Sequence, residues 1–238
     1  MIAQVMRNIL KGKTALVTGS TSGIGLGIAR VLGRNGANVM LNGFGSAQQI
    51  EEVKASFKKE NIPVGFNGAN LMKREEMSSL IQHTQREFGA CDILVNNAGI
   101  QHVSCVEEFP IEKWDDIIAL NLTAVFLATK YALPSMRKRG YGRIINVSSV
   151  HGLVASVNKS AYVASKHGVM GFTKTLALET AGSGVTSNAI NPGWVLTPLV
   201  QMQIDTKAKQ KQISIQQATE ELLGEKQPSK QFVTPEQI

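Results

Sequence analysis

Three side chains in the second half of the chain have the types and spacing needed to move a proton at an alcohol or carbonyl oxygen. Tyr162 and Lys166 are four residues apart, so on a helix they share one face. Ser149 precedes Tyr162 by thirteen residues. A phenol has an ordinary pKa of about 10, and a neighbouring ammonium favours its anionic form. Because an alcohol that loses hydride must also lose its O–H proton, this set predicts a hydride-transfer enzyme.

A glycine-rich segment near the start of the chain predicts a site for a nucleotide phosphate. Gly19, Gly23 and Gly25 follow a short apolar run and open an amphipathic one. Glycines let the backbone approach a pyrophosphate, and the N-terminus of a helix offers free N–H groups to its charge. The spacing Gly-x-x-x-Gly-x-Gly differs from the commoner Gly-x-Gly-x-x-Gly. Alone, it also fits an ordinary tight turn.

The elements that must position these residues alternate along the chain. Short β-branched runs followed by helical patterns predict a parallel sheet with right-handed crossovers. The expected strands are Thr14–Thr18, Asn38–Leu41, Val64–Phe66, Ile93–Asn96, Arg143–Val147 and Thr186–Ile190. The expected helices are Gly23–Asn35, Ala47–Glu60, Arg74–Phe88, Glu112–Arg139 with a disturbance near Asn121, and Ala161–Thr180.

Several of these strands are apolar throughout, which burial on both faces of a sheet requires. No linker or repeat divides the chain, so we expect an α/β fold, a doubly wound Rossmann-like parallel sheet in a single domain covering residues 1–238. Ligands of such sheets bind beyond the carboxyl ends of the strands. The glycine turn, the Asn97-Ala98-Gly99 loop and the Pro192-Gly193 loop all follow strands at that edge.

Composition argues against several other classes of protein. The formal net charge is +7, but the basic residues are scattered and aromatic residues make up only 5%, so nucleic acid is not an expected partner. The chain has no run of about 18 uninterrupted apolar residues, so no membrane span is expected. Cys91 and Cys105 lack disulfide or metal-ligand spacing, and Met1 to Lys13 lacks the apolar core of a signal peptide. We therefore expect a cytoplasmic protein without a metal.

Taken together, the motifs resemble the short-chain dehydrogenase/reductase family, which carries the same glycine turn, Asn-Asn-Ala-Gly, an Asn, a Ser, Tyr-x-x-x-Lys and Pro-Gly in this order. The likeness covers Lys11 to Ile238. It implies a homotetramer and a sheet of about seven strands. By resemblance, Tyr162 is the general acid/base, and Lys166 lowers its pKa and holds the nicotinamide ribose. Ser149 would hydrogen-bond the substrate oxygen, and Asn121 would hold a water that links Lys166 to solvent.

The resemblance also assigns the cofactor site. Its residues gather at the carboxyl edge of the expected sheet, and they are Gly19, Thr21, Ser22, Gly23, Ile24, Gly25, Phe44, Asn70, Leu71, Asn97, Ala98, Gly99, Tyr162, Lys166, Pro192, Gly193, Val195 and Thr197. Folds that prefer NAD usually carry an acid after the second strand, but Leu41 to Gly45 contains none. The same segment and Ser22 also offer no cation for the extra phosphate of NADP. By elimination, we expect NAD.

Longer phrases narrow the resemblance to the bacterial-type D-3-hydroxybutyrate dehydrogenases. These phrases are Leu41-Asn42-Gly43-Phe44-Gly45, Asn97-Ala98-Gly99-Ile100-Gln101-His102, His151-Gly152-Leu153-Val154-Ala155, Asn158-Lys159-Ser160-Ala161-Tyr162 and Glu225-Lys226-Gln227-Pro228-Ser229. That branch oxidises (R)-3-hydroxybutyrate to acetoacetate with NAD, so a small anionic hydroxy or keto acid is the implied substrate. The residues assigned to it by resemblance are Gln101, Ser149, His151, Lys159, Tyr162, Trp194 and Gln203, with Trp194 as an apolar wall.

Other functions stay open at this point. Without its flanking sequence, Lys159 would be read as a solvated lysine and His151 as an ordinary loop histidine. A carbonyl reductase for acyl thioesters or sugars would tolerate loss of Lys159 and use NADP. A nucleotide-bound scaffold or sensor would have no need of Ser149, Tyr162 and Lys166.

Two segments near the end of the sequence carry further expectations. Residues 195–227 have the pattern of one or two short helices, and the resemblance implies that they form a lid over the substrate. Thr234-Pro235-Glu236 has the features of a helix start. In the family, that helix and a seventh strand follow. Without them, the sheet would keep an exposed edge and part of the tetramer contact would be missing.

Overall fold

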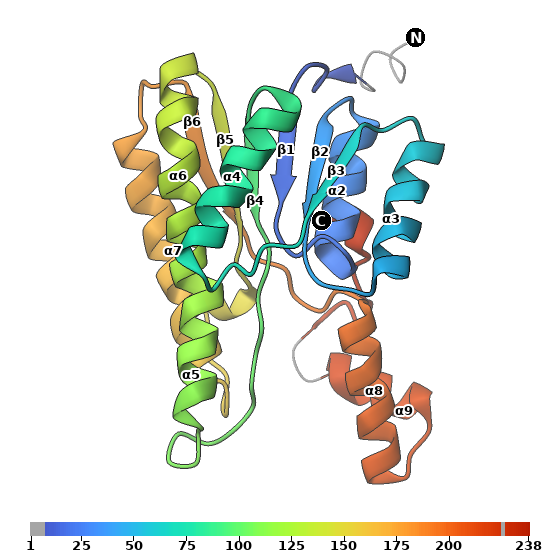
Figure 1. Cartoon of the computed structure of the whole chain (residues 1–238). Helices are drawn as coiled ribbons and strands as arrows, with labels where there is room; N and C mark the ends of the chain where they lie inside the picture. The colour runs from blue at the N-terminus through green and yellow to red at the C-terminus, as the bar shows by residue number, and fades with distance from the viewer. Residues whose placement is uncertain (1–7, 225–226) are drawn as a thin grey trace.

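Six parallel strands form one sheet in the order β3-β2-β1-β4-β5-β6 in the computed structural model (Figure 1). The structure describes residues 8–224 and 227–238, so the expected domain 1–238 and lid 195–227 each include residues outside this part. The strands are β1 (Thr14–Val17), β2 (Asn38–Asn42), β3 (Val64–Asn67), β4 (Ile93–Asn96), β5 (Gly142–Val147) and β6 (Val185–Ile190). The strand order changes direction between β1 and β4, which is where a doubly wound sheet binds its ligand.

Successive residues of the central strands pack alternately into two hydrophobic cores, one on each face of the sheet. Leu16 of β1 and Leu94 of β4 belong to the first core, whereas Val17 and Val95 belong to the second. All four side chains are fully buried. Because both faces are covered, these strands need apolar residues at consecutive positions rather than at alternate ones.

Helices cover both faces. α4 (Arg74–Phe88), α6 (Ala124–Arg139) and α7 (Ser160–Glu179) pack on the first core, and α2 (Gly23–Arg34) and α3 (Ala47–Lys59) pack on the second. The expected doubly wound α/β sheet is therefore confirmed. The ends of the six strands and of the five expected helices differ from the predicted ends by at most one residue.

The long helical stretch before β5 is interrupted, as expected. α5 (Ile111–Ile118) is followed by a π-helical turn, η2 (Ala119–Thr123), before α6 begins. Asn121 lies in the middle of this turn and is buried. π-turns inside α-helices are rare and often mark functional sites.

This stretch, Ile111–Arg139, has the length and apolar composition of a membrane-crossing helix, although only 44% of its most apolar window is buried. Asn121 and Lys130 interrupt its apolar residues, so a criterion of uninterrupted apolar residues does not select it. Leu127, Ala132 and Met136 of this stretch pack into the first core. Packing against the sheet thus accounts for much of its apolar character.

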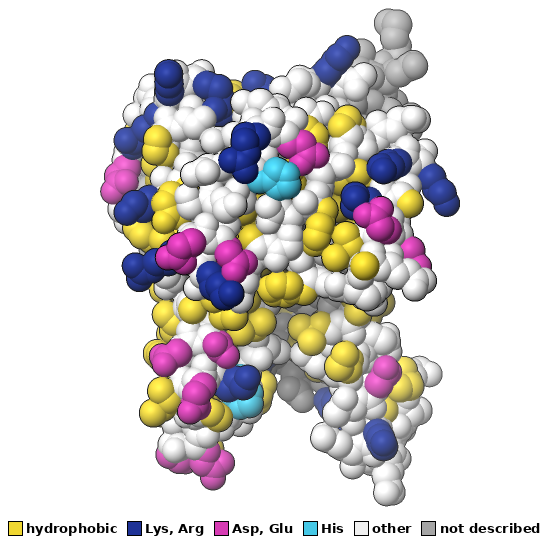
Figure 2. Space-filling model, in the orientation of Figure 1, with side chains coloured by type: hydrophobic (Ala, Val, Ile, Leu, Met, Phe, Trp, Pro, Cys, Tyr) yellow, Lys and Arg dark blue, Asp and Glu magenta, His cyan; other side chains and the backbone are white. Residues whose placement is uncertain are grey.

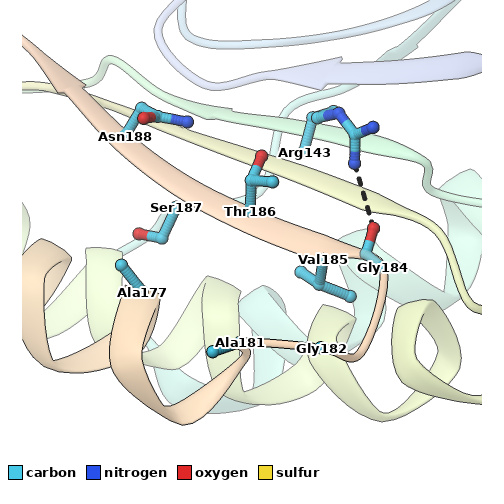
Figure 3. A pocket seen from close by; sticks show the side chains of 9 residues that line it. All are labelled: Arg143, Ala177, Ala181, Gly182, Gly184, Val185, Thr186, Ser187 and Asn188. Atoms are coloured by element: carbon cyan, nitrogen blue, oxygen red, sulfur yellow. Dashed lines mark hydrogen bonds between the residues drawn. The ribbon is translucent and has the colours of Figure 1, made fainter.

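β6 lies at one edge of the sheet, and within the described part of the chain no strand pairs with its outer side. A groove of about 480 Å³ runs there between β6 and the end of α7 (Figure 3). Ser187 lines the groove, and its hydroxyl oxygen is buried without a hydrogen-bond partner. At the start of β6, Arg143 donates to the Gly184 carbonyl oxygen at 3.0 Å. The groove is lined by residues 184–188, which include the first four residues of β6.

After β6 the chain forms a helical arm, residues 196–224, that stands away from the sheet (Figure 1). It contains α8 (Pro198–Lys211) and α9 (Ile215–Gly224), in agreement with the expected short helices. Val195 pairs with Val233 in a parallel bridge at the base of the arm. The expected helix start at Thr234 is a capped 3-10 turn, η4 (Pro235–Gln237), which packs closely on Gly27 of α2.

Candidate active site

The glycine turn between β1 and α2 is built for close backbone contact. A Cβ on Gly25 would lie 2.3 Å from the Gly19 carbonyl oxygen, and Gly19 and Gly23 have φ angles of +62° and +55°. Side chains are therefore excluded at Gly25 and strained at the other two positions. Ser22 precedes α2 without a side-chain cap, so protein side chains leave the first N–H groups of the helix open to an anion.

The loop after β4 is fastened to this turn. Thr18 Oγ1 accepts hydrogen bonds from the backbone N–H of Asn97 at 2.9 Å and of Ala98 at 3.1 Å. Asn97 Nδ2 donates to the carbonyl oxygens of Thr18 at 2.9 Å and Gly19 at 3.1 Å. The Asn97-Ala98-Gly99 loop and the glycine turn thus form one rigid edge.

The loop after β6 reaches the same place. A Cβ built on Gly23 would lie 3.5 Å from Thr197 Cγ2, so these two segments are in contact distance. The Pro192 carbonyl oxygen accepts from the Val150 N–H at 3.1 Å. Three of the predicted cofactor segments therefore converge, and Val195, which follows the third of them, is buried.

The segment after β2 leaves Phe44 exposed. Its carbonyl oxygen accepts from Thr21 Oγ1 at 2.9 Å, which ties it to the glycine turn. Asn42 is buried, and its amide donates to the carbonyl oxygens of Asn67 and Ala69. The side-chain N–H groups of Asn42 are therefore used in hydrogen bonds within the fold. Ile24 is partly buried on α2, while Asn70 and Leu71 lie in the loop between β3 and α4.

Ser149, Tyr162 and Lys166 meet at the carboxyl end of β5. Ser149 precedes a 3-10 turn, η3 (Val150–Gly152), and its hydroxyl hydrogen-bonds the Tyr162 phenol. Lys166 lies one turn after Tyr162 on α7, with Nζ 5.5 Å from the centroid of the tyrosine ring. Nζ also donates to the Val147 carbonyl oxygen at 2.8 Å. The spacing of these residues therefore produces the cluster predicted from the sequence.

Asn121 and Gly99 complete the wall behind Lys166. A Cβ on Gly99 would lie 3.2 Å from Asn121 Oδ1 and 3.7 Å from Lys166 Nζ. Asn121 Oδ1 accepts from the Ile100 N–H, and its Nδ2 donates to the Ile100 carbonyl oxygen, both at 2.9 Å. The amide is thus held by the backbone, and the predicted water-binding role of Asn121 stays a prediction.

Ser165 is a residue that sequence reasoning missed. Its hydroxyl donates to the Tyr162 carbonyl oxygen at 2.8 Å and accepts from Asn121 Nδ2 at 3.2 Å. It therefore links the π-turn to the helix that carries Tyr162 and Lys166. Its place between those two residues was the only signal in the sequence, because the contact with Asn121 spans 44 positions.

Burial is the main cause of the pKa shifts in this cluster. Burial raises the pKa of Tyr162 above its ordinary value of 10.0, and the hydrogen bond with Ser149 opposes that shift. Burial also lowers the pKa of Lys166 from 10.5 to about 8. The net shift of the Tyr162 pKa is upward because desolvation is its largest cause, and the Lys166 ammonium donates to Val147. The predicted effect of Lys166 on the Tyr162 pKa stays a prediction.

One of the predicted substrate residues, His151, contacts the cluster, and two others, Lys159 and Trp194, contact each other. The His151 and Tyr162 rings meet edge to face with centroids 6.2 Å apart, and Lys159 Nζ lies 5.8 Å from the Trp194 ring. Gln101, in the loop before α5, and Gln203, on α8, are partly buried. Figure 2 shows a hollow between the lobe that carries α5 and the helical arm. Among the described residues there is no group of His, Cys, Asp and Glu that could hold a metal ion.

Comparisons with known proteins agree with this geometry. A sequence model of the short chain dehydrogenase family matches residues 13–208. D-beta-hydroxybutyrate dehydrogenase from Cupriavidus necator is 58% identical over 97% of this chain and 89% of that protein, and the enzyme of that name from Rhizobium meliloti is 51% identical over 95% and 88%. A crystal structure of an actinorhodin polyketide ketoreductase with NADPH superimposes with a TM-score of 0.88 and 36% identity, covering 94% of this chain and 86% of that one.

Proposed function

Because this chain belongs to the short-chain dehydrogenase family, we propose that it is an oxidoreductase that interconverts (R)-3-hydroxybutyrate and acetoacetate with NAD as its cofactor. The meeting of Ser149, Tyr162 and Lys166 beside the glycine turn is the observation that carries this function. The two bacterial relatives named as D-beta-hydroxybutyrate dehydrogenases support the choice of substrate.

The backbone around the glycine turn fits a dinucleotide. The turn leaves no room for a Cβ at Gly25, and the start of α2 is uncapped, so backbone N–H groups rather than side chains face the phosphate position. When bound, the nicotinamide supplies the acceptor and donor of hydride. NAD is favoured over NADP because Ser22, Gly43 and Phe44 offer no cation for a further phosphate.

The groups of the catalytic cluster divide the work of proton transfer and charge stabilisation. The Tyr162 phenolate takes the proton of the substrate hydroxyl during oxidation and returns it during reduction. The Ser149 hydroxyl donates to the substrate oxygen and steadies the charge that develops there. The Lys166 ammonium holds the nicotinamide ribose and stabilises the phenolate, while Asn121 keeps a water path from Lys166 to solvent.

The carboxylate of the substrate requires its own donors. His151 and Lys159 precede Tyr162 by eleven and three residues, and the His151 ring contacts the Tyr162 ring. Gln101 and Gln203 would supply further donors to the carboxylate. Trp194 forms the apolar wall under Lys159. A small anionic acid held at both ends is thereby aligned for reaction.

Lys159→Ala is expected to raise KM for (R)-3-hydroxybutyrate about tenfold or more, because it removes the cation that pairs with the carboxylate. The Kd for NADH should change less than about twofold, since Lys159 lies on the substrate side. Steady-state kinetics and NADH fluorescence titration measure the two effects. Lys138→Ala, at the exposed end of α6, removes the same charge elsewhere and is the control. An unchanged KM in Lys159→Ala would contradict the assignment of Lys159 to the substrate carboxylate.

Acetoacetate reduction is expected to slow as the pH rises through about 8. The pKa of Lys166 is lowered to about 8, so its ammonium is present below that pH and lost above it. Reduction takes a proton from Tyr162 and leaves a phenolate that needs this ammonium. We expect kcat/KM to fall about tenfold per pH unit above the transition. A profile from pH 6 to pH 10 checks this, and a flat profile would contradict the role of Lys166.

Three further properties belong to the proposal. Residues 195–227 act as a lid of the single domain, since α8 and α9 flank the hollow, and its closure would exclude water from the reacting groups. The protein assembles as a homotetramer, by analogy with the family. It works in the cytoplasm, where Cys91 and Cys105, which are free thiols, stay reduced.

Absorbance of NADH at 340 nm tests the function directly. The purified protein and NAD should produce NADH with (R)-3-hydroxybutyrate at least about a hundredfold faster than with the (S) isomer, because only one face of the carbon meets the cofactor. Sugars, simple alcohols and acyl thioesters form the comparison panel. NADP-linked reduction of an acyl thioester, without turnover of 3-hydroxybutyrate, would overturn the assignment in favour of a different reductase.

A further inference from the structure

Gln227 lies where the helical arm returns to the sheet, and its side chain reaches across the base of the arm. Its backbone N–H donates to the Leu223 carbonyl oxygen at the end of α9, at 2.9 Å. Its side-chain Oε1 accepts from the backbone N–H of Trp194 at 3.0 Å. The Nε2 group donates to the carbonyl oxygen of Gln231. One amide therefore connects α9, the returning segment and the loop that carries Trp194.

Both backbone groups of Trp194 are held by this returning segment. Its N–H is bound by Gln227, and its carbonyl oxygen accepts from the Val233 N–H at 3.0 Å. The next contact follows at once, because the Leu196 N–H donates to the Val233 carbonyl oxygen at 2.9 Å. The segment that ends the arm and the segment that begins it are thus joined edge to edge at Trp194.

The Trp194 side chain links this joined segment to Lys159, one of the predicted substrate residues. Its ring lies 5.8 Å from Lys159 Nζ and packs on the core of the arm, which includes Val200, Ile204 and Ala218. A Cβ on Gly193 would lie 3.1 Å from Gln227 Oε1, so the amide also sits against the residue before Trp194. The Gln227 contact therefore passes movement of the end of the arm to the Trp194 backbone.

We propose that Gln227 is a positioning residue that ties the end of the arm to the Trp194 backbone, so that the arm and the substrate wall move as one unit. This inference rests on the proposed function, in which Trp194 and Lys159 border the substrate. Gln227 touches neither the substrate nor the reacting groups; it acts through Trp194. Loss of its acceptor oxygen leaves the Trp194 N–H without a protein partner and loosens the attachment of the Trp194 backbone to the end of the arm.

Two variants of Gln227 separate this role from simple folding. Gln227→Met keeps the length of the side chain but removes both hydrogen bonds, whereas Gln227→Glu keeps an acceptor for the Trp194 N–H. Gln216→Met is the matched control, because Gln216 lies on α9 and its amide bonds only to Glu220 on the exposed side of the arm. The full chain is used throughout, and thermal unfolding is recorded for each protein.

The first readout is hydrogen exchange at the Trp194 amide, measured without substrate. We expect exchange at least fivefold faster in Gln227→Met, near the unaltered rate in Gln227→Glu, and unchanged in Gln216→Met. The second readout is KM for (R)-3-hydroxybutyrate, which should rise at least fivefold in Gln227→Met while kcat and the Kd for NADH stay within about twofold.

Each outcome decides between the alternatives. If hydrogen exchange at the Trp194 amide is unchanged in Gln227→Met, the proposed connection between Gln227 and the Trp194 backbone is wrong, whatever the activity of the variant. Faster exchange with an unchanged KM shows a structural contact only and overturns the positioning role. If the unaltered protein does not turn over 3-hydroxybutyrate, the proposed function fails, but exchange at Trp194 still tests the tie by itself.

Discussion

Tyr162→Phe is expected to lower kcat for oxidation of (R)-3-hydroxybutyrate about 10²–10⁴-fold, the range that one general acid/base group contributes. The substitution removes a single oxygen, and that oxygen is the one that hydrogen-bonds Ser149. Phenylalanine keeps the ring that packs edge to face on His151. The loss should therefore fall on proton transfer rather than on folding, and steady-state kinetics in both directions measure it.

NADH binding separates a catalytic defect from a damaged site. The Kd of the Tyr162→Phe protein should stay within about threefold of the original value, since the phenol supplies only one of the contacts to the cofactor. Tyr131→Phe, on α6, is the matched control and should leave kcat unchanged. Retention of more than about a tenth of the original kcat in Tyr162→Phe would contradict the assigned base.

Lys166→Met is expected to lower kcat about 10²–10³-fold, the loss typical for removal of one group that stabilises developing charge. The ammonium stands 5.5 Å from the Tyr162 ring and is the cation on the same helix face. Methionine fills a similar volume without a charge, so the helix and the wall behind it should persist. Kinetics at pH 7 and at pH 9 test this, because the variant should also lack the transition near pH 8.

The same substitution should make the protein more stable near neutral pH. Lys166 is only 4% exposed, and a pKa of about 8 against an ordinary 10.5 means that the fold disfavours its charge by about 3 kcal/mol. Because the unfolded chain binds that proton more strongly, the free energy of unfolding of the original protein should rise between pH 8 and pH 10.5. Denaturant unfolding should show this rise, and Lys166→Met should lack it. A less stable variant would mean that the Val147 contact outweighs the burial cost.

Much of the sheet could be predicted because its local signals and its tertiary environment agree. Ile93, Leu94 and Val95 form an apolar run with β-branched members, and the fold buries that run on both faces. The four-residue spacing of Tyr162 and Lys166 likewise needs only a helix to become a shared face. The interruption at Asn121 was also expected, although its form as a π-turn depends on the contacts of Asn121 with Ile100.

The remaining features depend on contacts that sequence spacing does not encode. The direction of the Tyr162 pKa follows from how deeply the phenol is buried and where the Lys166 ammonium points. The hydrogen bond between Gln227 and Trp194 joins residues 33 positions apart, and neither residue type carries a signal for it. Local pattern therefore predicted that Ser149, Tyr162 and Lys166 meet, whereas their electrostatics and the attachment of the arm required the assembled fold.

Transfer of deuterium from substrate to cofactor tests the central claim most directly. The protein is incubated with NAD and (R)-3-hydroxybutyrate that carries deuterium at carbon 3, and the reduced cofactor is analysed by mass spectrometry. The account predicts a reduced cofactor one mass unit heavier than NADH, because hydrogen passes directly from that carbon. The Tyr162→Phe protein should form this product about 10²–10⁴-fold more slowly. Reduced cofactor without deuterium, or equal production by the Tyr162→Phe protein, would contradict it.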